Sequence, residues 1–200
     1  MSELQVQSAL AGVATPAGLS IGLREIAGRG MIDLRGLASD GNFMAAARDV
    51  LGVILPTAPR TSASWGDIRV LWMSTDQWLI LCAHEKMAEL LAALRSALAG
   101  IHSLAVDVSD MRAVIRLEGD GAREVLMKGC ALDLLGSGYG AGAVRRMRFA
   151  EIAALLHVVE DAVFDVYVFR SYALYAWEFL TATAREPAKI RLFGNQAAPV

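Results

Sequence analysis

The feature of the sequence that most constrains its fold is an order of predicted elements that occurs twice, with an offset of roughly 85 residues. Each time, two apolar runs typical of strands precede a helix, a strand pair joined by a tight turn, and a second helix; in the second half one further predicted strand precedes the strand pair. The predicted strands span residues 21–26, 30–35, 67–73, 77–83, 103–109, 111–118, 144–149, 152–160 and 164–170, and the predicted helices span 40–51, 85–99, 119–128 and 171–184. Such a repeat predicts an α+β fold of two pseudo-repeated halves, each an antiparallel sheet with covering helices.

Local landmarks recur at the same offset. Gly36, after the second predicted strand, corresponds to Gly119, and the turn at Asp76 corresponds to the turn at Asp161. We therefore divide the chain into an N-terminal arm (1–18), a first half (19–101), a second half (102–184) and a C-terminal tail (185–200).

Two helix starts and one loop are also predicted. Asp40 and Ser171 each precede a helical run and carry a side chain suited to accept a hydrogen bond from the first-turn backbone. Residues 52–66 contain Pro56 and Pro59 and are predicted to form a loop.

The chain of 200 residues is unusually apolar, since 55% of its residues are hydrophobic and only 20% are charged. Ordinary domains contain roughly 45–50% apolar and about 25% charged residues. The composition excludes intrinsic disorder, which requires low hydrophobicity, and two cysteines exclude a disulfide framework. The net charge of −2 predicts no nucleic-acid partner.

The apolar surplus does not predict a membrane span. The most apolar stretch, residues 149–169, is interrupted by Glu151, His157, Glu160, Asp161 and Asp165. The sequence starts Met-Ser-Glu-Leu-Gln, without the basic start and apolar core of a signal peptide. The two cysteines suit a reducing compartment, so the sequence predicts a cytoplasmic protein with no membrane partner.

The histidines, the cysteines and the glycine-rich segment, which could act in catalysis or ligand binding, do not form a recognised site in the sequence. His84, His102 and His157 have no metal-ligand spacing, and neither cysteine has a neighbouring base that would activate it. Residues 136–141 match G-x-G-x-x-A, but a predicted helix precedes them and a strand follows them, the reverse of a dinucleotide-binding motif. The sequence therefore predicts no catalytic, cofactor-binding or metal-binding residue in this chain.

The main basic cluster is formed by Arg145, Arg146 and Arg148. On a strand, Arg146 and Arg148 share one face and Arg145 points to the other. This face is either an ordinary solvent-exposed surface or a contact for an anionic partner surface.

The last predicted helix is apolar on more than one side. Its main stripe consists of Tyr172, Tyr175, Ala176, Phe179 and Leu180, and Leu174 and Trp177 fall outside it. Because a helix that is apolar all round is buried on several sides, either the fold covers this helix twice or another chain contacts Leu174 and Trp177.

Several segments together suggest a family. The central run is VDVSDMRAVIRLEG at residues 106–119, followed by AREVLMKGCALDL at 122–134; VLWMSTDQWL at 70–79 lies upstream, and FRSY at 169–172, with Trp177 and Leu180, lies downstream. In this order the segments resemble the gamma subunit of bacterial heterotetrameric sarcosine oxidase, and the resemblance covers about residues 22–185.

The resemblance implies the duplicated α+β fold shared with the glycine-cleavage T-protein and related folate-binding proteins. It also implies a complex with alpha, beta and delta subunits, which demethylates sarcosine to glycine and releases hydrogen peroxide. FAD, FMN and NAD are implied in the other subunits, with tetrahydrofolate as co-substrate and acceptor of the methyl carbon. No cofactor is implied in the gamma subunit itself.

One departure from the related enzymes favours a non-catalytic role. T-protein-like enzymes carry an acidic pair in a glycine-rich strand of this region, whereas the comparable stretch here, residues 150–157, has Ala153 and Ala154 and only Glu151 nearby. A general acid or base needs an ionisable group within reach of the proton. The leading hypothesis is a structural, assembly-promoting gamma subunit of sarcosine oxidase.

Three alternatives stay open at this stage. The chain is equally compatible with the gamma-type subunit of the related N-methylglutamate dehydrogenase. A stand-alone folate-binding one-carbon protein rests on fold analogy alone. An accessory domain of RNA modification, like the folate-binding part of a tRNA-modifying GTPase, would need a GTPase partner chain.

Overall fold

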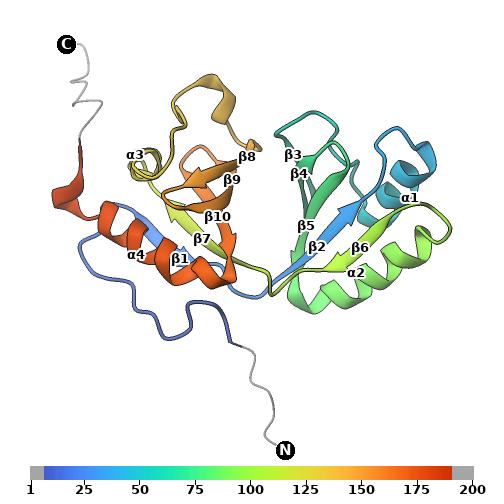
Figure 1. The fold of residues 1–200 in the computed structure, drawn as a ribbon, viewed down its shortest axis with the longest axis horizontal. Coiled ribbons are helices and arrows are strands. Elements are labelled where there is room, and N and C mark those ends of the chain that lie inside the picture. Colours follow the sequence, from blue (N-terminus) through green and yellow to red (C-terminus); the bar gives the residue numbers. More distant parts are fainter. Residues whose placement is uncertain (1–6, 191–200) are drawn as a thin grey trace, which may run out of the picture.

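Residues 7–190, which the computed structural model describes, form two five-stranded antiparallel sheets with helices on their outer sides (Figure 1). The strands are β1 (Gly22–Glu25), β2 (Arg29–Arg35), β3 (Ser62–Trp65), β4 (Ile68–Ser74), β5 (Gln77–Ala83), β6 (Leu104–Asp107), β7 (Arg112–Glu118), β8 (Val144–Phe149), β9 (Ile152–Glu160) and β10 (Val163–Phe169). The helices are α1 (Gly41–Leu51), α2 (His84–Ala97), α3 (Ala122–Met127) and α4 (Ala173–Thr183), with short 3-10 helices η1 (Ser137–Tyr139), η2 (Arg170–Tyr172) and η3 (Glu186–Ala188). The predicted α+β class is confirmed.

Each sheet takes one edge strand from the other half of the chain. The first sheet has the order β3-β4-β5-β2-β6, and the second sheet has the order β1-β7-β10-β9-β8. β6 is the edge strand beside β2 in the first sheet, and β1 is the edge strand beside β7 in the second sheet, so the two strands take equivalent places. The boundary predicted at residue 101 therefore separates equivalent sets of elements, but both sheets contain strands from each side of it.

The two sheets and their helices form four layers, visible from left to right in Figure 1. One apolar core lies between the second sheet and α3 and α4, and another lies between the first sheet and α1 and α2. A third cluster, which includes Met31, Leu81, Val114 and Tyr167, joins the two sheets face to face. Both faces of each sheet are thus largely covered, which accounts for the many strand residues that are apolar without strict alternation.

The repeat is visible in individual hydrogen bonds. The Gly36 N–H donates to the Asp76 carbonyl at 3.1 Å, and the Gly119 N–H donates to the Ala162 carbonyl at 3.0 Å. These bonds close the same corner of the two sheets, so the predicted correspondence of Gly36 with Gly119 is confirmed. Gly119 has a φ of 120°, in the region that favours glycine.

The prediction of a loop over residues 52–66 is wrong at its end, where β3 pairs with β4 from Ser62↔Leu71 to Trp65↔Ile68. β3 is the counterpart of β8 in the repeat. Its sequence, SASW, lacks apolar alternation, because it is held at the sheet edge by backbone pairing and not by burial of its side chains.

One predicted helix start is confirmed and one is wrong. The Asp40 carboxylate accepts hydrogen bonds from the backbone N–H groups of Asn42 and Phe43 at 2.9 and 3.3 Å. Ser171 is not an N-cap, since it lies inside η2 and α4 begins at Ala173 without a side-chain cap. The 3-10 turn η2 leads directly into α4, and its C-cap residue Ala173 donates its backbone N–H to the Arg170 carbonyl.

The predicted arm and tail lie partly outside the described residues, at positions 1–6 and 191–200. Within the described part of the arm, Leu10 is buried against the second sheet, and its backbone N–H donates to Glu25 at 3.2 Å. The start of the tail is held through an isolated bridge between Leu19 and Arg185. No helix within residues 7–190 is long and apolar enough to cross a membrane.

Candidate functional site

The polar residues of interest lie on the inner face of the second sheet, the face that packs on the first sheet. Val114, Val144, Leu155 and Tyr167 belong to the cluster between the sheets and mark this face. Because side chains alternate along a strand, the residues two positions away share it. These form a buried row of Arg116, Asp165 and His157 and a second row, near the end of the interface, of Arg112, Phe169, Ala153 and Arg148.

A buried ion pair lies at the centre of the first row. Asp165 is 2% exposed, and its two carboxylate oxygens accept hydrogen bonds from Nε and a terminal nitrogen of Arg116 at 2.6 and 2.9 Å. The hydrogen bond to Asp165 raises the pKa of Arg116 above its ordinary value. This two-point pairing with Arg116 occupies both oxygens of Asp165 and gives the carboxylate a structural role in the sheet interface.

His157 lies beside this pair and is held as a neutral imidazole. Ser62 Oγ donates to the Gly142 carbonyl at 2.9 Å and lies 3.3 Å from His157 Nε2. Since a hydroxyl has one proton to donate, Nε2 must be the protonated nitrogen. Nδ1 then carries a lone pair with no hydrogen-bond partner among the described residues. Burial, opposed by Asp165 and reinforced by Arg69, Arg116 and Arg29, lowers the pKa of His157 to about 4.

We expect His157 to make the fold sensitive to moderate acid. The unfolded chain takes up a proton at His157 near pH 6.5, whereas the folded chain does so only near pH 4. The contribution of the neutral His157 side chain to the free energy of unfolding is therefore complete above pH 6.5. It is lost as the pH falls toward 4, by roughly 3 kcal/mol in total. Urea unfolding at a series of pH values should show that the free energy of unfolding falls less steeply with decreasing pH in His157→Gln than in wild type. His102→Gln, at an exposed position, is the control and should keep the wild-type slope; equal slopes in all three proteins would contradict the expectation.

A cleft lined by arginines opens where the two sheets diverge. Its inner part is a hollow of about 220 Å³ between Arg35 and Gln77 of the first sheet and Arg112 and Arg146 of the second. Its outer part, of about 780 Å³, is lined by Arg60, Arg145, Arg146 and Arg148 together with aromatic residues. Both parts share Met73, Arg146, Ala153 and Ala154. We call this combined hollow the arginine cleft.

The arginines of the cleft differ in what holds them. Arg145 donates to the Gly138 carbonyl at 3.0 Å and lies over the Tyr139 ring, and Arg148 pairs with Glu151. Arg112 lies over the Phe169 ring at 5.3 Å. Within residues 7–190, the guanidinium groups of Arg112 and Arg146 have no hydrogen bond or ion pair, and no carboxylate lines the cleft. Burial, opposed by Asp33 and reinforced by Arg146, lowers the pKa of Arg112.

The prediction for the basic cluster is confirmed in its geometry. Arg146 and Arg148 share the inner face of β8 and line the cleft, whereas Arg145 turns back to the loop before β8. That loop, residues 136–141, lies between α3 and β8 and contains η1. Because a strand follows it, this loop lacks the helix N-terminus that the G-x-G-x-x-A motif places at a dinucleotide phosphate.

The predicted buried stripe of the last helix is confirmed only in part, since Ala176 and Leu180 are buried and Phe179 packs against the core but Tyr172 is exposed. Trp177 is 5% exposed and belongs to the core, whereas Tyr175, assigned to the buried stripe, is exposed. Leu174 is 51% exposed, as expected for a residue outside the stripe. The actual stripe is Ala173, Ala176, Trp177, Leu180 and Thr181. Ala176 and Leu180 belong to both the predicted and the actual stripe. Contact of Leu174 or Trp177 with a partner stays a prediction, and burial leaves Trp177 little surface for it.

The histidines and cysteines do not converge on a reactive centre. Within residues 7–190, no three His, Cys, Asp or Glu side chains come together as metal ligands. Burial raises the pKa of both thiols, Cys82 and Cys130, which disfavours the reactive thiolate. His84 and His102 are exposed at separate places on the surface.

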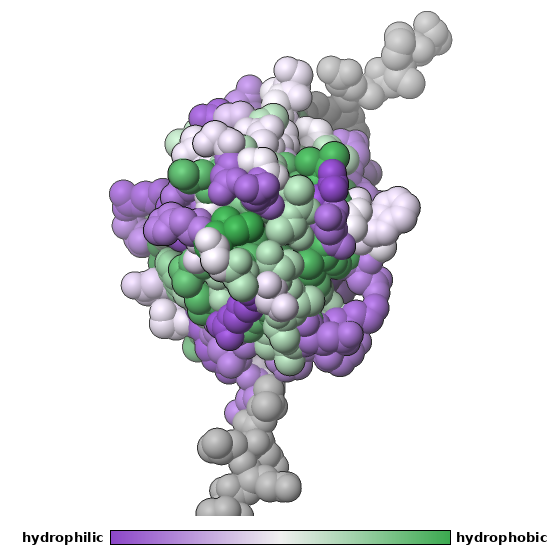
Figure 2. Space-filling model, turned by 90° about the vertical axis from the view of Figure 1, so that its right-hand side faces the viewer, coloured by the Kyte–Doolittle hydropathy of each residue, from purple (hydrophilic) through white to green (hydrophobic). Residues whose placement is uncertain are grey.

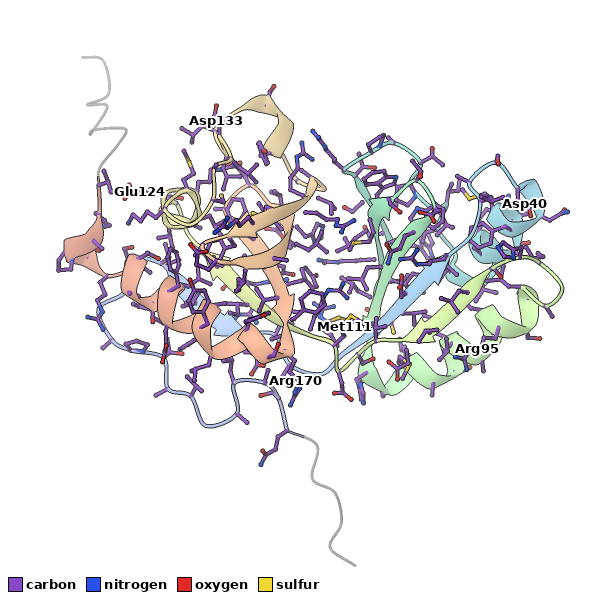
Figure 3. The ribbon with its side chains drawn as sticks, in the orientation of Figure 1. Asp40, Arg95, Met111, Glu124, Asp133 and Arg170 are labelled. Atoms are coloured by element: carbon purple, nitrogen blue, oxygen red, sulfur yellow. The ribbon has the colours of Figure 1, made fainter. Side chains whose placement is uncertain are left out.

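Sequence reasoning missed Arg35, Arg60 and Arg112 as members of the cleft. They come from three segments far apart in the sequence, and the packing of the two sheets brings them together. The available signal was the polar face of β7, where Arg112 and Arg116 alternate with apolar residues. Figure 3 labels Met111 and Arg170, which lie where the two sheets meet. The Arg170 N–H donates to the Met111 carbonyl at 2.9 Å.

The duplicated halves and the cleft between their sheets define a protein of the T-protein-like α+β class. A glycine-cleavage aminomethyltransferase T from Bartonella henselae has the same fold, with a TM-score of 0.58 and 13% identity, over 81% of this chain and 45% of that one. A chain of the heterotetrameric sarcosine oxidase from Corynebacterium sp. U-96, solved in complex with pyrrole 2-carboxylate, matches with a TM-score of 0.83 and 26% identity. This match covers 92% of this chain and 97% of that one.

The family follows from the sequence comparisons. The model of the family described as "Sarcosine oxidase, gamma subunit family" matches residues 35–186. The sarcosine oxidase subunit gamma of Corynebacterium sp. (strain P-1) is 31% identical over 157 residues, which cover 78% of this chain and 72% of that protein. The chain therefore belongs to the sarcosine oxidase gamma subunit family, and the resemblance found in the sequence is confirmed.

Proposed function

We propose that this chain is the gamma subunit of a heterotetrameric sarcosine oxidase, in which it has a structural role and assembles with alpha, beta and delta subunits. The observation that carries the proposal is the match over nearly the whole chain to a subunit of a solved heterotetrameric sarcosine oxidase, together with the family match. In this proposal the complex converts sarcosine to glycine and releases hydrogen peroxide. The methyl carbon leaves as formaldehyde or as methylene-tetrahydrofolate.

Two features of the cleft support a role without catalytic residues. Ala153 and Ala154, in the stretch where related enzymes carry acidic residues, line the cleft and supply no ionisable group. The buried carboxylate nearby, Asp165, is bound by Arg116 at both oxygens. A general acid or base for tetrahydrofolate chemistry is therefore a poor fit to these residues, and we assign FAD, FMN, NAD and the folate reaction to the other subunits.

The exposed apolar surface supports assembly. Figure 2 shows the face formed by α1 and α2, which carries a broad hydrophobic area bordered by polar side chains. Helix α2 carries exposed alanines at positions 88, 92, 93 and 97. Interfaces of permanent complexes resemble a protein core cut in half, so such a surface suits a subunit better than an isolated protein.

The test is co-expression of this chain with the alpha, beta and delta subunits encoded in the same genome. We expect the chain to co-purify with flavin-containing subunits that oxidise sarcosine, and we expect its omission to reduce the yield of assembled complex several-fold. Size-exclusion chromatography, flavin absorbance and sarcosine-dependent hydrogen peroxide release are the measurements.

Two results would contradict the proposal. A complex that oxidises N-methylglutamate but not sarcosine would favour the related dehydrogenase. A chain that ignores the other subunits but binds tetrahydrofolate saturably in a fluorescence titration would favour the stand-alone folate-binding protein.

A further inference from the structure

We propose that the arginine cleft is a docking site for an acidic, extended segment of another subunit, which lies along β8 and pairs a carboxylate with Arg146, at the mouth of the inner hollow that Arg112 also lines. This inference rests on the proposed function, because it names the surface and the chemistry through which the chain assembles.

The first argument is the charge of the cleft. Its walls contain six arginines from both sheets and, within residues 7–190, no carboxylate. Arg112 and Arg146 hold their guanidinium groups toward the inner hollow without a hydrogen-bond partner among the described residues. Guanidinium groups bind carboxylates through paired hydrogen bonds. Two adjacent cations with unused donors are therefore complementary to an anion in the cleft.

The second argument is the open edge of β8. β8 ends the second sheet, and within residues 7–190 the strand that pairs with it is β9; an isolated bridge joins Thr61 to Ala143, beside the first residue of β8. The Val144 N–H points away from β9, because it donates to the Arg60 carbonyl at 2.9 Å. Backbone groups alternate between the two edges of an antiparallel strand, so those of Arg146 and Arg148 also point to the open edge. An extended segment can pair with these groups as an added strand.

The spacing of the arginines fits an extended partner. Arg146 and Arg148 lie on one face of β8 and are two residues apart, about 6.6 Å along the strand. Alternate side chains of an extended peptide repeat at the same interval. Arg148 already pairs with Glu151, so the free guanidinium on this face is that of Arg146. A strand with acidic residues at alternate positions matches the backbone edge and the charge of Arg146, whereas a small anion in the inner hollow would not use the backbone edge.

The occupant comes from another chain. Residues 1–6 and 191–200 of this chain contain one acidic side chain, Glu3, so neither terminus supplies an acidic strand. A nucleic acid would use the arginines but not the backbone groups of the β8 edge. A protein segment uses both, and the family match to a subunit of a multi-subunit enzyme supplies the setting for such a segment.

The first experiment measures assembly. We expect Arg146→Glu to weaken binding of the chain to the other co-expressed subunits by roughly tenfold or more, and Arg112→Gln combined with Arg146→Glu to weaken it further. Arg24→Glu is the matched control, because Arg24 is exposed on β1, at the edge of the second sheet opposite β8. Circular dichroism and urea unfolding check that each variant folds, and Arg146, exposed and without bonds, is the variant least prone to disturb folding.

The outcomes separate this inference from the proposed function. If the wild-type chain does not assemble with the other subunits, the proposed function fails. If the wild type assembles and Arg146→Glu assembles equally well, the docking inference fails while the proposed function stands. Two results support the inference. At low salt the cleft variants lose assembly while the control keeps it, and at high salt the wild type also loses assembly because the charges are screened.

The second experiment identifies the occupant. A photo-crosslinking amino acid replaces Ala153, which lines the cleft, in the assembled complex. We expect the crosslinked peptide to come from one partner subunit and to contain acidic residues at alternate positions. A crosslink to a segment without acidic residues would overturn the inference.

A binding assay with defined probes completes the test. A fluorescein-labelled ten-residue glutamate-rich peptide should bind the full chain saturably, and Arg146→Glu should abolish this binding. Displacement of the peptide by low millimolar inorganic phosphate would indicate a small-anion site instead, and tighter binding of a ten-residue adenylate RNA would indicate a nucleic-acid site; either result overturns the proposal.

Discussion

Replacing Asp165 by alanine is expected to lower the free energy of unfolding by about 3–5 kcal/mol. The reason is not the strength of the Arg116–Asp165 pair itself, because desolvation offsets much of the attraction between two buried charges. The loss arises because Arg116, whose side chain is only 14% exposed, would keep its charge inside the sheet interface with only the more distant and more exposed carboxylate of Glu118, 4.0 Å away, to balance it. A loss of this size is a large part of the total stability of an ordinary domain, which is about 5–15 kcal/mol.

The design of the experiment separates the pair from its individual charges. Asp165→Asn keeps the shape and one acceptor, and we expect a smaller loss than in Asp165→Ala. The double variant Arg116→Met/Asp165→Leu removes both charges, and we expect it to recover most of the stability. Urea unfolding followed by circular dichroism gives each value. A double variant less stable than Asp165→Ala would show that the pair itself supplies net stability.

Arg24→Ala is the control for an exposed pair on the same sheet. Its guanidinium lies 3.0 Å from Glu118, and both side chains are well exposed. Exposed pairs contribute little, so we expect a change of less than about 1 kcal/mol. A loss comparable to that of Asp165→Ala would contradict the role assigned to burial.

The order of elements was predictable from the sequence, but their pairing was not. Periodicity locates most strands and helices because each element has a buried and a less buried side. It does not show that β1 and β6 exchange sheets, since the partner of a short edge strand depends on backbone contacts between distant segments. β3 escaped prediction for a related reason, because the sequence SASW carries no hydrophobic pattern.

The cleft was predictable only in part. Adjacent arginines on β8 drew attention to Arg146 and Arg148, since an alternating charged face stands out in an apolar sequence. Arg35 and Arg112 did not stand out, because each is an ordinary strand-end arginine until the two sheets pack face to face. A sequence pattern identifies charged residues that share one face of a single strand. It does not identify a site whose residues come from two sheets and meet only in the folded protein.

The apolar surplus also changes its meaning once the layers are known. Two sheets that pack on each other and on helices bury both faces of most strands, and such strands are nearly continuous in apolar residues. Part of the 55% hydrophobic content is therefore internal. The remainder lies on exposed positions such as Leu174 and the α2 alanines. These positions and the cleft are therefore better candidates for an interface with another subunit than Trp177.

Replacing Trp177 by alanine is accordingly expected to affect folding before it affects assembly. Trp177 is 5% exposed and packs in the core beneath α4. Truncation of a buried tryptophan removes its apolar contacts and leaves a cavity, which costs about 3–5 kcal/mol. We therefore expect a lower urea midpoint for the isolated chain. We also expect a reduced yield of complex that is explained by the smaller folded fraction.

Leu174→Ala provides the matched comparison on the same helix, one turn away and 51% exposed. If α4 contacts another subunit, Leu174→Ala should weaken assembly while it changes the free energy of unfolding by less than about 1 kcal/mol. Trp177→Phe, which keeps an aromatic ring in the core, should restore much of the stability lost in Trp177→Ala. A Trp177→Ala chain that unfolds like wild type but no longer assembles would contradict this expectation, because it would place the indole ring in an interface and not in the core of this chain.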